Sequence, residues 1–346
     1  MLSYLTAGES HGKALLAILE GMPAGFKVEV SRINRELMRR KLGYGRGKRM
    51  QIEQDKAEIL SGLKNSLTLG SPIGILIKNK DFSIERLPPV VCPRPGHADL
   101  AGLLKYGFSD VRNVLERASA RETAARVAVG AVCKTFLEEF GIRIISRVLE
   151  IGGSSGRGPV RKIIDEAREN KDTVGGIFEV KALNVVSGLG SYAQPDRRLD
   201  ACLAKAVMSV PGIKAVQIGL GFGYAGKFGS EVHDPIYYSK NKGFYRRTNN
   251  AGGIEGGVSN GEDIILSACM KPISTLLRPL ESVNIRTKKK ARASIERSDI
   301  CVVEAAGIIA EAGVAFELAR AFLEKFGSDA LSDIKVSYRG YLKRLR

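Results

Sequence analysis

Tryptophan is absent from this sequence of 346 residues, and histidine and cysteine are scarce, with three and five copies. The cysteines are scattered, odd in number and free of C-x-x-C pairs, which is typical of reduced thiols rather than a disulfide framework. The histidines lack ligand-like spacing, so we expect no metal site. No apolar run is long enough to span a bilayer, and the N-terminus lacks the apolar stretch of a signal peptide. These absences predict a cytoplasmic protein that does not insert into membranes.

Aromatic residues make up only 6% of the chain, whereas positive charge is abundant, with a formal net charge of +17. A surface of this sign suits nucleic acid, an anionic membrane or small anionic ligands. A nucleic-acid binder needs a long basic stripe or stacking aromatic side chains, and the second of these is in short supply. An enzyme that binds phosphates needs arginines beside glycine turns instead. The position of the charge along the chain therefore decides between these classes.

The stretch GESHG, residues 8–12, fits the G-x-S-x-G pattern of the nucleophile elbow in serine hydrolases. That elbow requires a strand, a sharp turn and then a helix. The residues that follow, KALLAILEGMPAG, are apolar only briefly before glycine and proline interrupt them, which is too short for the elbow helix. Neither His97 nor His233 lies in a late loop after a suitable acid, as a catalytic triad would need. We therefore predict that GESHG is not a hydrolase elbow.

The spacing of apolar residues predicts a mixture of helices and strands in a single domain, 1–346, without an obvious linker. We expect helices over 31–41, 112–139, 160–170, 195–209 and 302–326, and strands over 73–77, 143–149, 176–183, 215–219 and 263–268. The alanines of the 112–139 helix indicate very close packing of a neighbour. The stretch before Ser31 and the stretch before Pro195 both read as strand, glycine-containing turn and helix. This echo favours two similar α+β halves, although chance also produces such echoes.

The stretch RRKLGYGRGKRM, residues 39–50, combines arginines with three glycines. Arg40 ends the expected helix, and Arg46 and Arg49 lie in the glycine-containing loop. Guanidinium groups match phosphate oxygens bidentately and stay charged, and glycines let backbone amides approach an anion. The alternative is a solvated RNA-binding segment of the RGG kind. Because the segment occurs once and leads into an ordered-looking stretch, the pattern favours a structured anion site.

Three further stretches could take part in a site. PRPGHADLAG, residues 93–102, holds His97 on a turn stiffened by two prolines, where it is either catalytic or, as more often for a lone loop histidine, structural. The glycine-rich residues 249–261 could bring backbone amides to a ligand or form a surface lid, and KPIST, 271–275, could hold a phosphate. By spacing alone, Arg297 and Asp299 read as a surface ion pair.

Together and in this order, these stretches resemble the chorismate synthase family over nearly the whole chain. The resemblance is carried by TAGESHGKAL, RRKLGYGRGKRMQIEQDKAEILSG, RPGHADLAG, ERASARETAARVAVGA, AGGIEGGVSNGED, KPIST, RSDICVV and AEAGVAFELARAFLEKFG. It implies an α+β fold, the β-α-β sandwich of that family, assembled as a homotetramer. It also implies a lyase of the shikimate pathway to aromatic amino acids, which converts 5-enolpyruvylshikimate 3-phosphate into chorismate by 1,4-elimination of phosphate. Reduced FMN would be the cofactor, without net redox change, and NADPH a possible reductant.

Matching positions imply roles for particular residues. His11 would give a proton to the reduced flavin, His97 would help to neutralise the leaving phosphate, and Asp299 would act near flavin N5. The phosphate of NADPH or of the substrate would be bound by Arg40, Arg46 and Arg49. Flavin contacts would come from Arg117, Ala118, Ser119, Gly256, Lys271, Pro272, Ile273, Ser274, Thr275 and Arg297.

Three positions depart from the family pattern: Ser298 where a histidine is common, Pro211-Gly212 at the expected flavin edge, and Arg320 where an aspartate is frequent. The second departure puts that flavin contact in doubt. Two alternatives of other classes stay open at this point. A basic RNA-binding protein would use the +17 charge, and a flavin oxidoreductase would use the same pocket for net hydride transfer. The resemblance favours neither, since it implies no nucleic-acid partner and no net oxidation.

Overall fold

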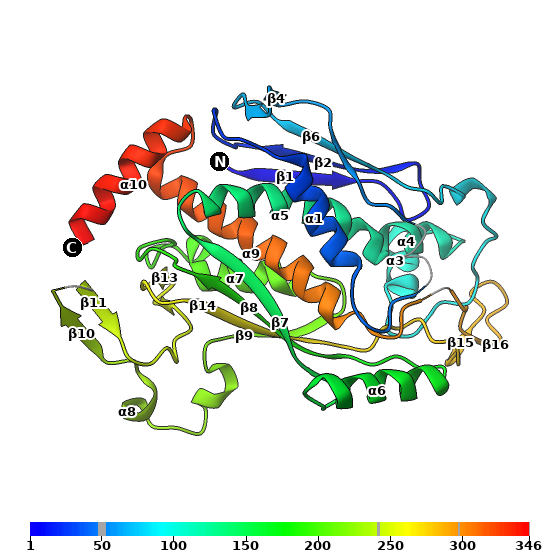
Figure 1. The fold of residues 1–346 in the computed structure, drawn as a ribbon. Coiled ribbons are helices and arrows are strands. Elements are labelled where there is room, and N and C mark those ends of the chain that lie inside the picture. The colour runs from blue at the N-terminus through cyan, green and yellow to red at the C-terminus, as the bar shows by residue number, and fades with distance from the viewer. Residues whose placement is uncertain (48–52, 241–242, 297, 346) are drawn as a thin grey trace.

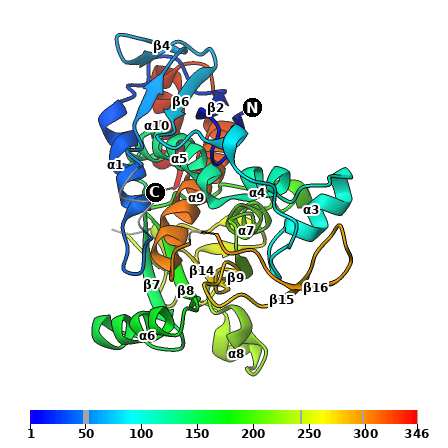
Figure 2. The same ribbon diagram turned by 90° about the vertical axis from the view of Figure 1, so that its right-hand side faces the viewer.

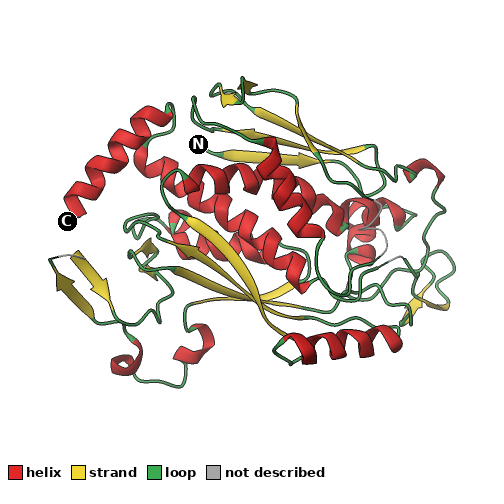
Figure 3. Cartoon of the chain, in the orientation of Figure 1, coloured by secondary structure: helices red, strands yellow, loops and turns green. Residues whose placement is uncertain are grey.

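The computed structural model describes residues 1–47, 53–240, 243–296 and 298–345. Arg49 and Arg297, two of the predicted ligand-binding residues, lie outside the described residues. Two antiparallel sheets form the outer layers, and a layer of helices lies between them (Figures 1 and 3). This β-α-β sandwich is the α+β architecture that the resemblance implies.

The first sheet has the strand order β1-β2-β6-β3, with all neighbours antiparallel. Its strands are β1 (Ser3–Ala7), β2 (Ala14–Glu20), β3 (Ala57–Ile59) and β6 (Ile73–Lys78), and helix α1 (Val30–Lys41) lies between β2 and β3 in the chain. Burial alternates along β2, where Leu15, Ala17 and Leu19 face the interior, as expected for a sheet with one covered face. GESHG lies in the β1–β2 hairpin loop, so a strand and not a helix follows it. The prediction that it is no hydrolase elbow is confirmed.

The second sheet repeats this plan with the order β7-β8-β14-β9, again antiparallel. Its strands are β7 (Arg143–Ile151), β8 (Gly176–Leu183), β9 (Ile213–Ile218) and β14 (Ile264–Met270), and helix α7 (Leu199–Met208) lies between β8 and β9 in the chain. In both halves the first two strands are followed by a helix, and the fourth strand inserts beside the second. Each half then ends in a long helix, α5 (Thr123–Glu138) or α9 (Val303–Phe326). The weak repeat in the sequence therefore corresponds to two halves of the same topology.

Helices α5 and α9 form the centre of the molecule, between the two sheets (Figures 1 and 2). They approach each other so closely that a Cβ atom on Gly130 would lie 2.3 Å from the Cβ of Ala312. Most of their buried side chains are aliphatic or aromatic, and Phe136 and Phe322 meet edge to face. A buried ion pair, Lys134 of α5 with Glu311 of α9 at 2.6 Å, also joins the two helices. The close packing that the alanine-rich stretch predicts is thus confirmed, with α9 as the neighbour.

The continuous helix predicted over 112–139 is wrong, because the chain bends at Ser119. Helix α4 (Arg112–Ala118) ends there, a 3₁₀ turn, η2 (Ala120–Glu122), follows, and only then does α5 begin. Ser119 adopts an extended backbone with ψ of 143°, and its hydroxyl accepts a hydrogen bond from the Arg121 backbone N–H. Serine offers the backbone this alternative to a helical bond, which propensity alone does not reveal. The bend exposes Ser119 and Arg121 to the cavity described below.

The remaining elements cover the edges of the sandwich. They are β4 (Leu63–Lys64), β5 (Leu67–Thr68), η1 (Ile84–Arg86), α3 (Asp99–Tyr106), α6 (Arg157–Glu169), η3 (Pro195–Arg197), η4 (Gly221–Tyr224), α8 (Gly229–Val232), β10 (Ile236–Ser239), β11 (Gly243–Arg246), β12 (Ile254–Glu255), β13 (Val258–Ser259), β15 (Glu281–Val283), β16 (Lys290–Arg292) and α10 (Leu331–Leu345). The other predicted helices and strands are present with ends shifted by a few residues. Within the described part of the chain, no helix combines the length and apolar character that crossing a bilayer requires.

Candidate active site

A cavity of about 880 Å³ opens at one end of the sandwich, and equivalent connections of the two halves line it. From the first half come the end of α1, the α1–β3 connection and the β6–α5 connection. From the second half come the end of β14, the α7–β9 connection and the β14–α9 connection. The lining residues are Arg40, Arg46, Gly47, Gly96, His97, Ala98, Ala118, Ser119, Ala120, Arg121, Pro211, Gly212, Met270, Lys271, Pro272, Ile273, Ser274, Thr275, Leu277, Ser298, Asp299 and Val302. Most of the predicted site residues therefore meet in one place.

Cations dominate the charged lining. Arg40, Arg46, Arg121 and Lys271 carry fixed positive charge, and Asp299 is the only carboxylate among the described lining residues. The Arg46 side chain is 11% exposed, with a terminal nitrogen 3.6 Å from Asp299 Oδ2 and a buried Nε that has no hydrogen-bond partner among the described residues. Asp299 in turn accepts a hydrogen bond from the Gly47 backbone N–H. Since buried guanidinium N–H groups are costly to leave unpaired, this surface is suited to an anionic ligand.

His97 is held by a buried carboxylate. Its Nδ1 lies 2.5 Å from Asp99 Oδ1 and 3.1 Å from an Arg94 nitrogen. An arginine nitrogen only donates, so Nδ1 would have to accept a hydrogen bond from Arg94 but donate one to Asp99, and it cannot do both. The shorter contact indicates that Nδ1 carries the proton and donates it in a hydrogen bond to Asp99. This tautomer leaves Nε2 available to the cavity. Burial would raise the pKa of Asp99, but the hydrogen bonds from His97 and Arg94 outweigh it and hold that pKa well below its usual range.

The KPIST stretch is fastened to the same loop. Lys271 Nζ donates to the Gly96 carbonyl at 2.9 Å, and the Ser274 hydroxyl donates to it at 3.1 Å. On the far side, Arg94 donates to the Thr275 hydroxyl at 2.6 Å. Burial, and then the charge of Lys214, lower the pKa of Lys271 from its ordinary value. The two loops come from different halves, so these contacts join the halves at the cavity.

His11 lies next to the cavity but does not line it. Its Nδ1 is 2.9 Å from Glu116 Oε1, and its backbone N–H donates to Glu116 Oε2 at 2.7 Å. The Nε2 atom is 4.0 Å from Asp81 Oδ2. Burial would raise the pKa of Glu116, and the bonds from His11 lower it below its ordinary value. Because Glu116 is two residues before Ala118 in α4, and Ala118 lines the cavity, the histidine is linked to the lining through that helix.

Two other predicted flavin contacts are also outside the cavity. The Arg117 guanidinium donates to the carbonyls of Gly8 and Thr6 at 2.9 and 3.0 Å and so supports the GESHG hairpin from outside. Gly256 lies in the turn between β12 and β13 with φ of +58°, and no atom beyond its chain neighbours lies within 4 Å of where its Cβ would be. Pro211 and Gly212 do line the cavity despite their departure from the family pattern. The geometry thus brings some predicted contacts together and leaves others apart.

The structure adds residues that the sequence reasoning missed. Arg121 lines the cavity, Arg94 and Asp99 hold His97, and Glu116 holds His11. Each lies in or directly beside a stretch singled out above, within five residues of a predicted site residue. An arginine or carboxylate so close to a stiff loop histidine is the signal that could have pointed to Asp99 and Arg94.

A cavity with fixed cations, an oriented histidine and apolar walls defines an enzyme site for a small anionic molecule. Comparison with known proteins identifies the family: the chorismate synthase model matches residues 2–323, and the chain belongs to this family of lyases. It is 55% identical to the chorismate synthase of Thermoanaerobacter pseudethanolicus, over 99% of this chain and 98% of that protein. Identity to the Caldanaerobacter subterraneus subsp. tengcongensis chorismate synthase is 54%, over 100% and 99% of the two chains. A chorismate synthase crystal structure aligns with a TM-score of 0.82 at 42% identity, covering 99% of this chain and 98% of that one.

Proposed function

We propose that this cavity converts 5-enolpyruvylshikimate 3-phosphate into chorismate. One observation carries the proposal: Arg40, Arg46, Arg121 and Lys271 converge with His97 on a single cavity that has one described carboxylate. The substrate carries a phosphate and two carboxylates, so binding it requires several fixed cations. The departing phosphate also needs its charge stabilised as the C–O bond breaks. The bound partner is thus a small molecule rather than nucleic acid.

The residues present also fit a phosphate-bearing flavin. Apolar side chains such as Met270, Ile273 and Leu277 offer walls for a flat ring system, and Gly212 lines the cavity without a side chain. Arg46 lines the cavity, and its buried Nε, which has no hydrogen-bond partner within the described chain, fits a phosphate oxygen. The family uses reduced FMN, and the volume of about 880 Å³ lies in the range of pockets that hold drug-sized ligands.

The chain's own groups then act on the substrate. With Nδ1–H committed to Asp99, protonated His97 presents an Nε2–H donor that neutralises the leaving phosphate. Asp299, fixed by the Gly47 amide, would act near the substrate carbon that loses hydrogen. A C–O bond and a C–H bond break, the ring gains a double bond and phosphate leaves, so the substrate undergoes no net oxidation. The chemistry that reduced FMN supplies when bound is electron donation and acceptance of the departing hydrogen.

All of the residue roles stay predictions, and five of them rest on the family resemblance because the described cavity lining does not include their residues. His11 as proton source, Arg117 and Gly256 as flavin contacts, and Arg49 and Arg297 as ligand-binding residues belong to this group. For His11, the bond to Glu116 and its place beside α4 support a role close to the ligand rather than in contact with the described lining. NADPH as the reductant of the flavin likewise rests on the resemblance, as does a cytoplasmic location.

We also propose the homotetramer that the family resemblance implies. The outer face of the first sheet exposes Leu5, Leu16 and Ile18, with 70%, 43% and 50% of their surface accessible. The corresponding face of the second sheet exposes Ile145, with 43% of its surface accessible, but also carries the Arg147–Glu179 ion pair. An uncovered apolar sheet face is typical of an interface between subunits. Leu5→Lys with Ile18→Lys should shift the protein to smaller species in sedimentation; an unchanged tetramer would place the interface elsewhere.

Anaerobic incubation with FMN, dithionite and substrate tests the activity directly. We expect chorismate absorbance and released phosphate in equal amounts. FMN should also bind more tightly with substrate present, because linkage makes the coupling between the two ligands reciprocal. Net oxidation of the product would indicate an oxidoreductase. No turnover, together with RNA binding that falls steeply with salt, would indicate a nucleic-acid protein.

A further inference from the structure

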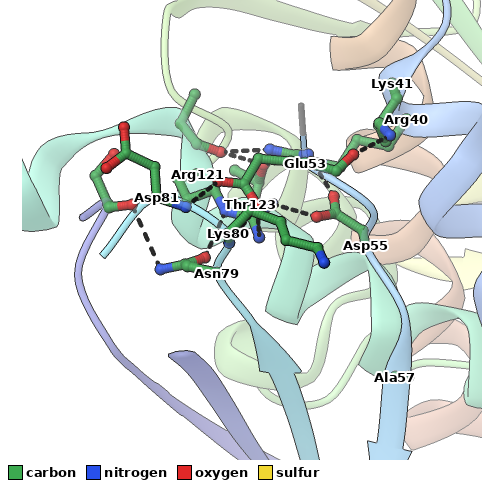
Figure 4. A network of polar contacts seen from close by, with 12 residues as sticks. Arg40, Lys41, Glu53, Asp55, Ala57, Asn79, Lys80, Asp81, Arg121 and Thr123 are labelled. Atoms are coloured by element: carbon green, nitrogen blue, oxygen red, sulfur yellow. Dashed lines mark hydrogen bonds and ion pairs between the residues drawn. The ribbon is translucent and has the colours of Figure 1, made fainter. Parts of the chain in front are cut away.

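Behind the cavity, two buried carboxylates face two of its arginines (Figure 4). Asp55 Oδ1 accepts a hydrogen bond from Arg121 at 2.6 Å, and Asp55 Oδ2 lies 3.5 Å from Arg40. Glu53 Oε2 lies 3.7 Å from Arg121 and accepts a hydrogen bond from the Lys80 backbone N–H at 2.9 Å. Neither carboxylate is among the residues that line the cavity.

The remaining bonds fix both guanidinium groups from the side. Arg40 donates from Nε to the Thr123 hydroxyl at 2.9 Å and from a terminal nitrogen to the Ala120 carbonyl at 2.8 Å. Arg121 donates from Nε to Asn79 Oδ1 at 2.9 Å. The Asn79 amide donates to the Gly12 carbonyl at 2.7 Å, which ties the network to the GESHG hairpin. The third nitrogen of each arginine makes no hydrogen bond among the described residues and has only a longer ion pair: Arg40 Nη1 faces Asp55 at 3.5 Å, and Arg121 Nη2 faces Glu53 at 3.7 Å.

Among the described carboxylates, Asp55 is the one paired with both arginines. Two guanidinium groups in one wall repel each other, and burial makes their charge costly. Burial, together with the charges of Arg121 and Arg46, lowers the pKa of Arg40 to about 10, and the charge of Asp55 acts in the opposite sense. Removing Asp55 would leave both cations without their common counter-charge.

We propose that Asp55 is a positioning residue, which holds Arg40 and Arg121 in the arrangement that receives the substrate's anionic groups. This inference rests on the proposed function for the identity of the ligand. The proposal predicts that removing Asp55 weakens anion binding, which is the opposite of what the change in charge alone would do. Removing a carboxylate makes the cavity more positive, which by Coulomb attraction alone would tighten anion binding. Loss of position weakens binding instead.

The test compares Asp55→Asn with Glu53→Gln. The second variant removes the same unit of charge and the longer ion pair to Arg121 at 3.7 Å, but it leaves the hydrogen bond and ion pair of Asp55 in place. We expect Asp55→Asn to raise the substrate KM at least tenfold, with a much smaller effect on kcat. Glu53→Gln should change KM by less than threefold or lower it. Thermal unfolding of both variants without ligand reports whether they fold. A folded Asp55→Asn protein with unchanged or lower KM would overturn the proposal.

Asp55→Glu keeps the experiment decisive if Asp55→Asn does not fold. It preserves the charge and moves the carboxylate by one methylene, so an increase in KM would come from position, and an unchanged KM would overturn the proposal. Calorimetry with inorganic phosphate separates this inference from the proposed function. If the parent enzyme shows no turnover, the proposed reaction is wrong. The positioning role still requires weaker phosphate binding in Asp55→Asn than in the parent and in Glu53→Gln, and equal binding would overturn it.

Discussion

The α1–β3 connection of the first half and the α7–β9 connection of the second occupy equivalent places in the two topologies, and both reach the cavity. The first carries Arg46 in a glycine-rich loop, whereas the second is the short turn with Pro211 and Gly212. The β6–α5 connection of the first half, which carries His97 and Arg121, likewise corresponds to the β14–α9 connection of the second half, where Lys271 is the cation among the described lining residues. A repeated framework therefore places four connections around one cavity, but most of the described cations that line it belong to the first half.

The contrast suggests a division of labour. In the proposed function, the first half supplies the arginines and the oriented histidine that would bind and release phosphate. The second half supplies apolar walls, Lys271 and Asp299. Since the loops of the two halves are bonded to each other at Gly96 and Thr275, neither set is positioned alone. Substitutions in the first half should therefore cost more activity than those in the second.

The largest effect is expected at His97. His97→Ala should lower kcat by about a hundredfold or more, the range for loss of a positioned acid–base group. His233→Ala is the matched control, because His233 is exposed and outside the cavity lining. Steady-state kinetics across pH measures both. A His97→Ala enzyme with the parent's turnover and pH profile would show that the first half does not supply the acid.

Asp99→Asn should lower kcat roughly ten- to a hundredfold, since hydrogen bonds to charged groups are worth about 1.5–3 kcal/mol. In a double variant with His97→Ala, the loss should be far from multiplicative, because Asp99 acts through His97. The lowered pKa of Asp99 also predicts a stability effect. Its contribution is present above the unfolded pKa and is lost as pH falls. The Tm difference from the parent should thus be full at neutral pH and shrink below about pH 4.

Arg46→Ala tests the charge of the glycine-rich loop. A charge-assisted contact to phosphate is worth about 1.5–3 kcal/mol, so the phosphate-bearing ligand should bind roughly ten- to a hundredfold more weakly. The ligand-free Tm should stay close to that of the parent, because the Arg46 Nε has no hydrogen-bond partner among the described residues and the ion pair to Asp299 is long, at 3.6 Å. Arg35→Ala removes the same charge from an exposed position of α1 and is the control. Equal KM values for the two variants would refute a localised anion site in this loop.

The sequence alone predicted the framework well for a physical reason. The sequence shows directly which residues of a strand such as β2 alternate between the two faces, and which small residues of α5 allow close packing. The bend at Ser119 left no such trace, because the stretch on both sides has good helical propensity and only packing selects the serine bond. The Arg121–Asp55 pair spans 66 residues, so nothing local indicates it. His97 and Arg46 were predictable as cavity residues because proline-containing and glycine-rich loops can be recognised from the sequence alone.

The smallest effect should come from the second half, at Lys271. A contact of this kind in a partly exposed setting is worth up to about 1 kcal/mol, so Lys271→Met should weaken substrate binding about fivefold at most. The pKa of Lys271 is lowered, so its charge is lost at a lower pH than that of an ordinary lysine, and KM should rise early on the alkaline side. Lys271→Arg should move that rise to higher pH, and Lys214→Met should move it upward slightly by removing a neighbouring positive charge. If Lys271→Met instead cost as much as Arg46→Ala, the two halves would share the phosphate equally and the division of labour would be wrong.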